Sequence, residues 1–240
     1  SETSERPTSE PVDLAPSDPA VELTDGLRRI YVVGDSRYVK LVLDLDRSKH
    51  PGAEIISGTI VGCGLLPPPE QHNPPACRER YDRWSRDIAQ HEPDLVVAAL
   101  SLTDLLDRDV GGQATEYGSE RLRQAAIAEL DRLMAVLDAD QTTEIRLLTF
   151  SCADPIASLT PHSAMSSADR AERAAWLNDL VRDYASAASE HSVSVVEGAA
   201  FGCQDSLPVA TVAGTPLYED GYHYTDAGAD LFWTWLLPQL

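Results

Sequence analysis

The chain has 240 residues, and 43% of them are apolar, which is enough to bury the core of one medium-sized α/β domain. Its formal net charge of −20 argues against a nucleic-acid or anionic-membrane partner, because phosphate groups are bound by clustered lysine and arginine. No apolar run approaches the roughly 18 to 20 residues of a membrane-spanning helix. The composition therefore favours a globular domain whose ligands are not polyanions.

Residues 1–26 are rich in serine, glutamate and proline, with too few apolar side chains to offset the entropy of ordering them. We predict a disordered acidic linker here, followed by a single domain at 27–240. A linker ahead of a complete domain suggests a further segment upstream, and a disordered tail without a role is the alternative.

From Leu27 onward, apolar runs typical of buried strands alternate with segments of helical period. The predicted strands span 28–33, 53–61, 93–100, 143–150 and 192–198. The predicted helices span 38–46, 78–90, 119–137, 167–190 and 225–237. One helical face is assigned to the core, formed by Leu122, Ile127, Leu130, Leu133, Met134 and Leu137. Because each connection is long enough for a crossover, we predict a three-layer α/β/α sandwich around a five-stranded parallel sheet.

The first candidate site residue is Ser36, in a Gly-Asp-Ser sequence that directly follows the first predicted strand. Ligands of parallel sheets collect outside the carboxyl ends of the strands. With a helix beginning near Tyr38, the Ser36 hydroxyl should lie near backbone N–H groups that favour negative charge. The alternative is that the three residues form only a turn and a helix cap.

The second candidate pair is Asp220 and His223, which precede a helix that Thr225 can cap. A serine hydroxyl needs a base within hydrogen-bond reach, usually a histidine whose tautomer is fixed by a carboxylate. An isolated Asp-x-x-His is more often an exposed histidine beside an ordinary acid. Its occurrence together with Gly-Asp-Ser in an α/β chain favours a Ser-His-Asp site.

With these two motifs, which read "VVGDSR" and "EDGYHYTDAG", the sequence resembles the SGNH (GDSL-type) hydrolase superfamily over residues 29–240. The resemblance implies a flavodoxin-like sandwich and a serine mechanism. It also implies that Ser36 is the nucleophile, that His223 is the general base and then acid, and that Asp220 orients the imidazole.

The two middle motifs of the family supply an oxyanion hole, from a glycine N–H after the second strand and an asparagine side chain after the third. The stretch "SGTIVGCG" offers Gly62, but the chain has Ser101-Leu102-Thr103-Asp104 where the family has Gly-x-Asn-Asp. The resemblance therefore implies donors from the Ser36 and Gly62 backbone. Thr103 is a candidate third donor, and a plain loop residue is the alternative.

Two further residues are candidates for substrate binding. Arg37 could steer an anionic acyl donor or acceptor, although a solvated residue at the start of a helix is the favoured interpretation. Asp104 is the second candidate. By contrast, Trp84 and Trp176 fall within amphipathic helices and are predicted to belong to the core rather than to sugar-binding platforms. His162 is predicted to be a surface loop residue.

Each of the four cysteines lies beside a predicted strand end, and none has the Cys-x-x-Cys spacing of a zinc site or redox motif. We expect no cofactor and no metal. Two disulfides are the simplest interpretation. Of the three formal pairings, Cys63 with Cys77 closes the loop after the second strand, and Cys152 with Cys203 joins the loops after the fourth and fifth. Such bonds predict an extracytoplasmic domain, whereas reduced cysteines would fit a cytosolic enzyme.

Four further features point to one subgroup of the superfamily. They are a Gly-Cys after the second strand, a cysteine before the tryptophan-bearing helix "CRERYDRWSRDI", the strand "PDLVV" and an acidic linker. In these features the chain is similar to SGNH domains fused to bacterial membrane acyltransferase family 3 proteins. That likeness implies transfer or hydrolysis of O-acyl groups on envelope glycans or glycosylated acceptors, with an N-terminal membrane acyltransferase domain as partner. Two alternatives are a free-standing secreted carbohydrate or lipid esterase, and a catalytically weak module that binds an acylated glycan.

Overall fold

The computed structural model describes residues 27–43, 47–67, 69, 73–139, 142–153, 165–188, 191–204 and 207–240. The predicted linker at 1–26 and His162 lie outside these ranges.

The centre of the fold is a five-stranded sheet in which every neighbouring pair of strands is parallel. In spatial order the strands are β2 (Ala53–Ser57), β1 (Arg28–Val33), β3 (Leu95–Ala99), β6 (Glu144–Leu148) and β7 (Val193–Val196). The middle strand β3 is buried along its whole length, as expected of a strand that is covered on both faces. The predicted sandwich with a five-stranded parallel sheet is confirmed.

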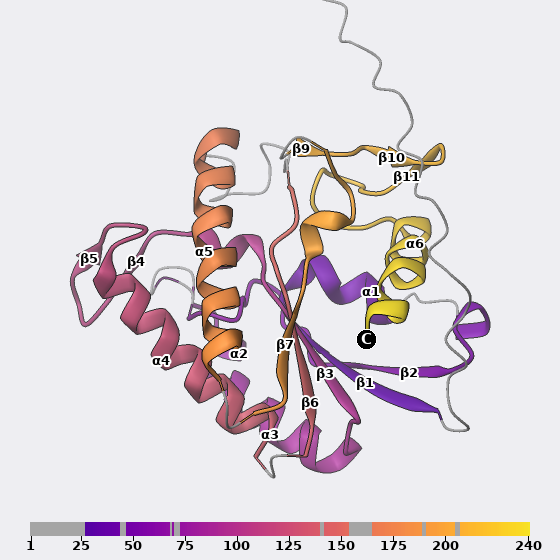
Figure 1. Ribbon diagram of the computed structural model, residues 1–240, viewed down its shortest axis with the longest axis horizontal. Helices are drawn as coiled ribbons and strands as arrows, with labels where there is room; N and C mark the ends of the chain where they lie inside the picture. The colour runs from indigo at the N-terminus through magenta and orange to yellow at the C-terminus, as the bar shows by residue number, and fades with distance from the viewer. Residues whose placement is uncertain are drawn as a thin grey trace, which may run out of the picture.

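Helices cover both faces of the sheet (Figure 1). On one face lie α1 (Val39–Leu43) and α6 (Asp226–Leu236), and on the other lie α3 (Arg80–His91), α4 (Glu120–Leu137) and α5 (Ser167–Ala187). Successive strand residues point to opposite faces. Val32 accordingly belongs to the core cluster that contains Trp233 of α6, and Val33 belongs to the cluster that contains Trp84 of α3. The predicted core position of Trp84 is confirmed.

Several predicted boundaries shift for local physical reasons. The strand predicted at 53–61 ends at Ser57, and the carbonyl of the next residue, Gly58, accepts its hydrogen bond from the indole N–H of Trp84 at 2.8 Å. The helix predicted at 78–90 is two helices, α2 (Pro75–Arg78) and α3, with Pro75 in the first turn of α2 where its missing N–H costs nothing. The helix predicted from Tyr38 starts earlier, as a 3₁₀ turn over Ser36–Tyr38 that continues into α1.

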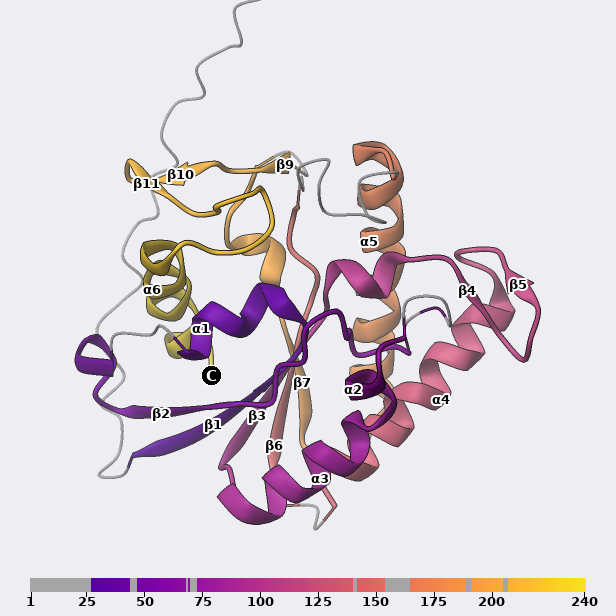
Figure 2. The same ribbon diagram turned by 180° about the vertical axis from the view of Figure 1, so that it is seen from behind.

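Three two-stranded hairpins were missed, because strands of two residues are too short to show alternation. They are β4–β5 (Arg108–Asp109, Ala114–Thr115), β8–β9 (Cys203–Gln204, Leu207–Pro208) and β10–β11 (Thr211–Val212, Thr215–Pro216). Figures 1 and 2 show that β4–β5 and β10–β11 project on opposite sides of the molecule.

The strand order creates a switch point between β1 and β3, because the chain runs from β1 outward to β2 and then returns to pair β3 on the other side of β1. Ligand sites of open α/β sheets form at such points, outside the carboxyl ends of the strands. The segments that follow β1 and β3 begin with Gly34 and Leu100. These segments are therefore where a site is expected.

Two disulfides join the expected pairs, Cys63 with Cys77 and Cys152 with Cys203, each with a Cα–Cα distance of 5.5 Å. The first ties the loop after β2 to α2, and the second ties the segment after β6 to β8. Of the helices described, none has the length and apolar character needed to cross a membrane.

Candidate active site

Ser36 is presented by a tight turn at the end of β1. A Cβ atom on Gly34 would lie 2.8 Å from the ring of Tyr38, so only glycine allows the chain to turn this closely. Asp35 then caps the following 3₁₀ turn, since its Oδ1 accepts a hydrogen bond of 2.9 Å from the backbone N–H of Arg37. Ser36 is the first residue of that turn and is partly exposed. The cap that the sequence suggested is real, but it belongs to Asp35, which leaves the Ser36 hydroxyl available.

The segment between β11 and α6 carries the other two candidates. Asp220 folds its own loop, because Oδ1 accepts hydrogen bonds from the backbone N–H groups of Tyr222 (3.0 Å) and His223 (2.8 Å). Gly221, between Asp220 and Tyr222, has a φ of 78°, which glycine adopts without strain. Thr225 caps α6 as predicted, accepting a hydrogen bond from Gly228 N–H at 2.9 Å. The loop is thus fixed at both ends.

The structure brings Ser36, His223 and Asp220 together from opposite ends of the chain. Nε2 of His223 lies 2.9 Å from Oγ of Ser36, and Nδ1 lies 2.6 Å from Oδ2 of Asp220. The imidazole and carboxylate side chains are 24% and 20% exposed. This arrangement places a base within reach of the hydroxyl proton and leaves the hydroxyl open to an incoming molecule.

The charge of Asp220 determines which ring nitrogen of the neutral His223 carries the proton. Burial raises the pKa of its carboxyl, but hydrogen bonds from the His223 ring and from two backbone N–H groups outweigh that effect and hold the pKa below its usual range. An ionised carboxylate can only accept hydrogen bonds, so Nδ1 of His223 carries the ring proton of the neutral imidazole. Nε2 is then the free base that faces Ser36.

The loop after β2 brings Gly62 towards the same turn. The N–H of Ile60 bonds the carbonyl of Gly34 at 2.9 Å, and the adjacent Cys63 is held by its disulfide. Gly62 has a φ of 74°, and a Cβ placed there would meet no atom within 4 Å, so the loop is open at this point. Gly62 is partly exposed, and no described residue accepts a hydrogen bond from its N–H, so this group is available as a backbone donor.

Thr103 is not a plain exposed loop residue. It lies in a 3₁₀ turn, η4 (Leu102–Leu105), is 3% exposed, and its hydroxyl donates to Oδ2 of Asp35 at 3.3 Å. The hydroxyl is engaged there, so the structure does not offer it as a third oxyanion donor.

Sequence reasoning missed a polar network directly behind Ser36. Oδ2 of Asp35 accepts a hydrogen bond of 2.6 Å from the hydroxyl of Tyr222, which in turn accepts one of 2.9 Å from the N–H of Leu102. Burial raises the pKa of Asp35, and the hydrogen bond from Tyr222 opposes that shift without cancelling it. Tyr222 occupies a variable position of the Asp-x-x-His motif, and no feature of the sequence indicates that it points inward.

The expectation that Arg37 is solvated is wrong, because the side chain is completely buried. Its Nη2 donates to the carbonyl of Cys152 at 3.1 Å and to the hydroxyl of Tyr218 at 3.2 Å. The guanidinium carbon also lies 5.2 to 5.8 Å from the centres of four aromatic rings, those of Phe150, Tyr218, Tyr222 and Tyr224. Cation–π attraction of this kind offsets part of the cost of burying the charge. Arg37 is therefore not free to steer a substrate.

The expectation that Asp104 contacts substrate does not fit its surroundings either. The side chain is fully buried and accepts hydrogen bonds from the backbone N–H groups of Leu66 and Ser101, each at 2.8 Å. A Cβ atom on Gly64 would overlap this carboxylate. Asp104 holds the loop after β2 against the turn after β3, and so supports the position of Gly62. In the part of the chain that is described, no cluster of histidine, cysteine, aspartate and glutamate side chains could hold a metal ion.

A model of the family described as "SGNH domain (fused to AT3 domains)" matches residues 9–233 of the chain. The fold is similar to that of the periplasmic domain of a lipopolysaccharide acetyltransferase from Salmonella ser. Paratyphi A, with 13% identity and a TM-score of 0.58 over 90% of this chain and 85% of that one. It is also similar to a carbohydrate acetylesterase family member from Sinorhizobium meliloti, with 16% identity and a TM-score of 0.58 over 88% and 96% of the two chains. A GDSL-like lipase from Bacteroides thetaiotaomicron gives 17% identity and a TM-score of 0.58 over 88% and 86%. The curated proteins include no match to the sequence.

Proposed function

Because the chain belongs to the family of SGNH domains that are fused to AT3 domains, we propose that it transfers or hydrolyses O-acyl groups with Ser36, His223 and Asp220 as its catalytic triad. The observation that carries the proposal is the continuous row of hydrogen bonds from Ser36 Oγ through the imidazole to the Asp220 carboxylate, at 2.9 and 2.6 Å. This is the geometry that makes a serine hydroxyl a nucleophile at neutral pH.

In the first half-reaction, Ser36 Oγ attacks the acyl carbonyl while Nε2 of His223 takes the hydroxyl proton. The tetrahedral oxyanion is stabilised by the backbone N–H groups of Ser36 and Gly62, and each such donor contributes on the order of 3 kcal/mol. Asp220 stabilises the imidazolium. The intermediate collapses when the leaving alcohol receives the proton from Nε2, which leaves an acyl ester on Ser36.

In the second half-reaction, His223 takes a proton from a sugar hydroxyl or from water as that oxygen attacks the ester, and the proton then returns to Ser36 Oγ. Attack by a sugar hydroxyl gives transfer, and attack by water gives hydrolysis. Which acceptor prevails depends on how well the bound sugar excludes water.

We propose that the acceptor is a cell-envelope glycan or another glycosylated molecule outside the cytosol. Two disulfides support this location, because such bonds persist in oxidising compartments. The description of the family as fused to AT3 domains supports a membrane acyltransferase as partner. A similar fold in the periplasmic domain of a lipopolysaccharide acetyltransferase agrees with both inferences.

The test is hydrolysis of p-nitrophenyl acetate by the wild type and by Ser36→Ala, with the exposed Ser194→Ala on β7 as a matched control. We expect Ser36→Ala to lower kcat by at least roughly 10³-fold and Ser194→Ala to leave it unchanged. Mass spectrometry of the wild type during turnover should find the acetyl group on the peptide that contains Ser36. Equal rates for wild type and Ser36→Ala would rule out the serine mechanism.

The partition between transfer and hydrolysis is measured in the same reaction by adding a neutral oligosaccharide. A transferase produces acetylated sugar at the expense of acetate, whereas an esterase produces acetate alone. A protein that turns over no ester but retains acylated glycan would be the binding module instead.

A further inference from the structure

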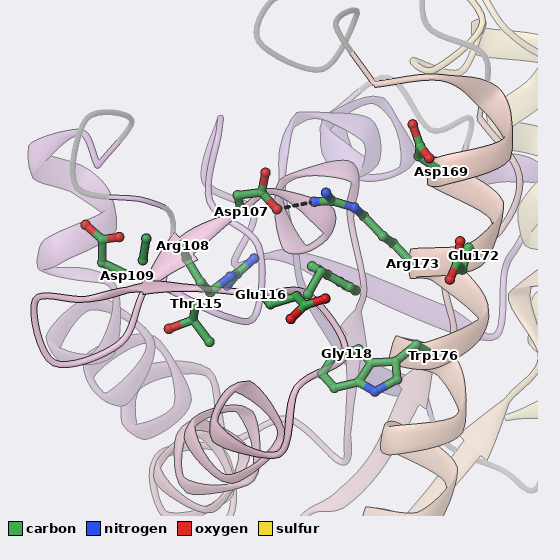
Figure 3. A pocket seen from close by; sticks show the side chains of 12 residues that line it. Asp107, Arg108, Asp109, Thr115, Glu116, Gly118, Asp169, Glu172, Arg173 and Trp176 are labelled. Atoms are coloured by element: carbon green, nitrogen blue, oxygen red, sulfur yellow. Dashed lines mark ion pairs between the residues drawn. The ribbon is translucent and has the colours of Figure 1, made fainter.

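A hollow of about 680 Å³ lies between the β4–β5 hairpin region and α5, and none of Ser36, His223 and Asp220 lines it (Figure 3). Residues 107–109 and 114–118 line one side, and Asp169, Glu172, Arg173 and Trp176 of α5 line the other. Its volume falls within the range of pockets that hold small molecules. We call this hollow the hairpin cleft.

Two arginines connect the hairpin cleft to the η4 turn that lies behind the proposed active site. Arg108, which lines the cleft, donates from Nη2 to the carbonyl of Asp104 at 2.7 Å, and Arg173 donates from Nη1 to the carbonyl of Leu105 at 2.9 Å. Both acceptors belong to the η4 turn, whose Thr103 bonds Asp35 next to Ser36. Side chains that line the cleft are therefore bonded to the same turn that contacts Asp35 beside Ser36.

Aromatic side chains give the hairpin cleft a surface on which a ring can stack. Tyr117 and Trp176 pack edge to face with centroids 5.0 Å apart, and both side chains are partly exposed. Trp176 packs against the core and also lines the cleft, so its predicted core role describes only part of its surroundings. In Figure 3 the indole lies beside Gly118 at one end of the cleft. A partly exposed indole that packing holds in place is a suitable platform for the C–H face of a sugar ring.

The charged side chains of the hairpin cleft indicate whether its ligand is neutral or anionic. Asp109, Glu116 and Glu172 are exposed, and within the described residues no hydrogen bond or ion pair engages their carboxylates. The two arginines are already used, since Arg108 donates to backbone carbonyls and Arg173 pairs with Asp107 at 2.7 Å. Free carboxylates accept hydrogen bonds from hydroxyl groups and repel anionic ligands.

We propose that the hairpin cleft binds uncharged sugar units of the glycan whose acyl groups are handled at Ser36. The proposal rests on the proposed function for its choice of a glycan, and it names the class of glycan: hydroxyl-rich saccharides without carboxylate, sulfate or phosphate groups. Trp176 stacks on one sugar ring, and Glu116 and Glu172 accept hydrogen bonds from its hydroxyl groups.

The experiment uses the Ser36→Ala protein, so that binding is measured without turnover. Isothermal titration calorimetry is carried out with maltohexaose, cellohexaose and mannohexaose as neutral probes and with hexagalacturonate as the anionic probe. We expect saturable binding of at least one neutral hexasaccharide and none of hexagalacturonate. Adding Trp176→Ala should weaken that binding about tenfold, as expected for the loss of an aromatic anchor.

A second variant is needed because Trp176→Ala could weaken binding by destabilising the fold. Glu116→Gln combined with Glu172→Gln changes only exposed groups and should weaken neutral binding several-fold while the melting temperature stays the same. Asp82→Asn, an exposed acid on α3 outside the cleft, is the matched control and should change nothing. Failure of all three neutral probes to bind at millimolar concentration overturns the proposal, as does equal binding of hexagalacturonate or indifference to the cleft variants. None of these outcomes depends on whether Ser36 is the nucleophile.

Discussion

Two sets of polar side chains lie next to each other but differ in exposure. One is the hydrogen-bonded row of Ser36, His223 and Asp220, and the other is the group of polar side chains packed behind that row. All three members of the row are partly exposed, whereas Asp35, Arg37 and Asp104 are at most 2% exposed. The buried acids are surrounded by donors from the protein itself, while Ser36 retains an open side. Residue type and position in the chain are therefore insufficient to tell an accessible polar group from a buried one, since the neighbours Ser36 and Arg37 differ completely in exposure.

The buried and the partly exposed carboxyl groups also differ in the direction of their pKa shifts. Burial raises the pKa of Asp35 and of Asp104 above the usual range, because the hydrogen bonds to each carboxylate do not fully replace water. Asp220, closer to solvent, has its pKa lowered by hydrogen bonds from His223 and Tyr222. The carboxyl that must stay ionised to hold the imidazole is therefore the one that the protein keeps partly hydrated.

The largest expected effect comes from Asp220→Asn, which keeps the shape of the side chain but favours the wrong tautomer of His223. We expect kcat for p-nitrophenyl acetate to fall by roughly 10³ to 10⁴-fold. Because the folded-state pKa of Asp220 lies below the unfolded value near 3.9, its ionisation stabilises the fold above about pH 4, and this is lost as pH falls through the folded pKa. Urea unfolding should show the stability advantage of the wild type over the variant shrinking in that acid range. A variant with wild-type kcat would remove Asp220 from the triad.

The next largest effect, on stability, is expected from substitutions of the buried Arg37. Arg37→Lys keeps the charge but cannot spread it over the surrounding rings, and we expect a loss of about 3 kcal/mol in the free energy of unfolding. Arg37→Met fills similar space without burying a charge and should cost less. Urea denaturation of both variants measures the difference. If the lysine variant is the more stable of the two, stacking of the guanidinium is not what stabilises this position.

The sequence predicted the layered fold, both disulfide pairings and the approach of Ser36, His223 and Asp220 to one another. Alternation of strands and helices, a Gly-Asp-Ser after β1 and an Asp-x-x-His before α6 can be read locally. The parallel topology brings the segments that carry Ser36, Asp220 and His223 to one edge of the sheet, and the hydrogen bonds within the Asp220 loop then set the distances between the side chains.

What the sequence did not predict depends on packing between distant segments. The burial of Arg37 arises from rings contributed by the segments after β6 and β11, and the inward position of Tyr222 arises from its contact with Asp35. The hairpin cleft exists because the two-residue strands β4 and β5 pair beside α5, and neither strand is long enough to leave a signal. Trp176 was assigned to the core because periodicity does not show that one side of its indole borders a hollow.

Asp104→Asn should give a smaller effect than the Arg37 variants, and chiefly on stability. An amide can present its oxygen to only one of the two donor sets, so either Leu66 N–H or Ser101 N–H loses its acceptor. A buried donor without a partner costs about 1 to 2 kcal/mol, and the amide N–H₂ that takes the place of the acceptor points a second donor at it, so we expect a loss of about 2 to 3 kcal/mol. Guanidinium unfolding measures this loss, with Asp82→Asn as the exposed control. Wild-type stability in Asp104→Asn would show that the carboxylate is not what joins the two loops.

The smallest effect is expected from Tyr222→Phe, which removes one hydroxyl from the buried network while leaving His223 and Asp220 untouched. Leu102 N–H loses its acceptor and Asp35 loses its shortest hydrogen bond, which together should cost about 1 to 2 kcal/mol. Since that bond opposes the rise in the pKa of Asp35, its removal raises this pKa further. A carboxyl whose folded pKa exceeds the unfolded value makes stability decline as pH rises between the two values, so in the variant the decline extends to higher pH. If the stabilities of wild type and variant change in the same way with pH across that range, Asp35 is not coupled to Tyr222, and the buried network has no influence on the charge beside Ser36.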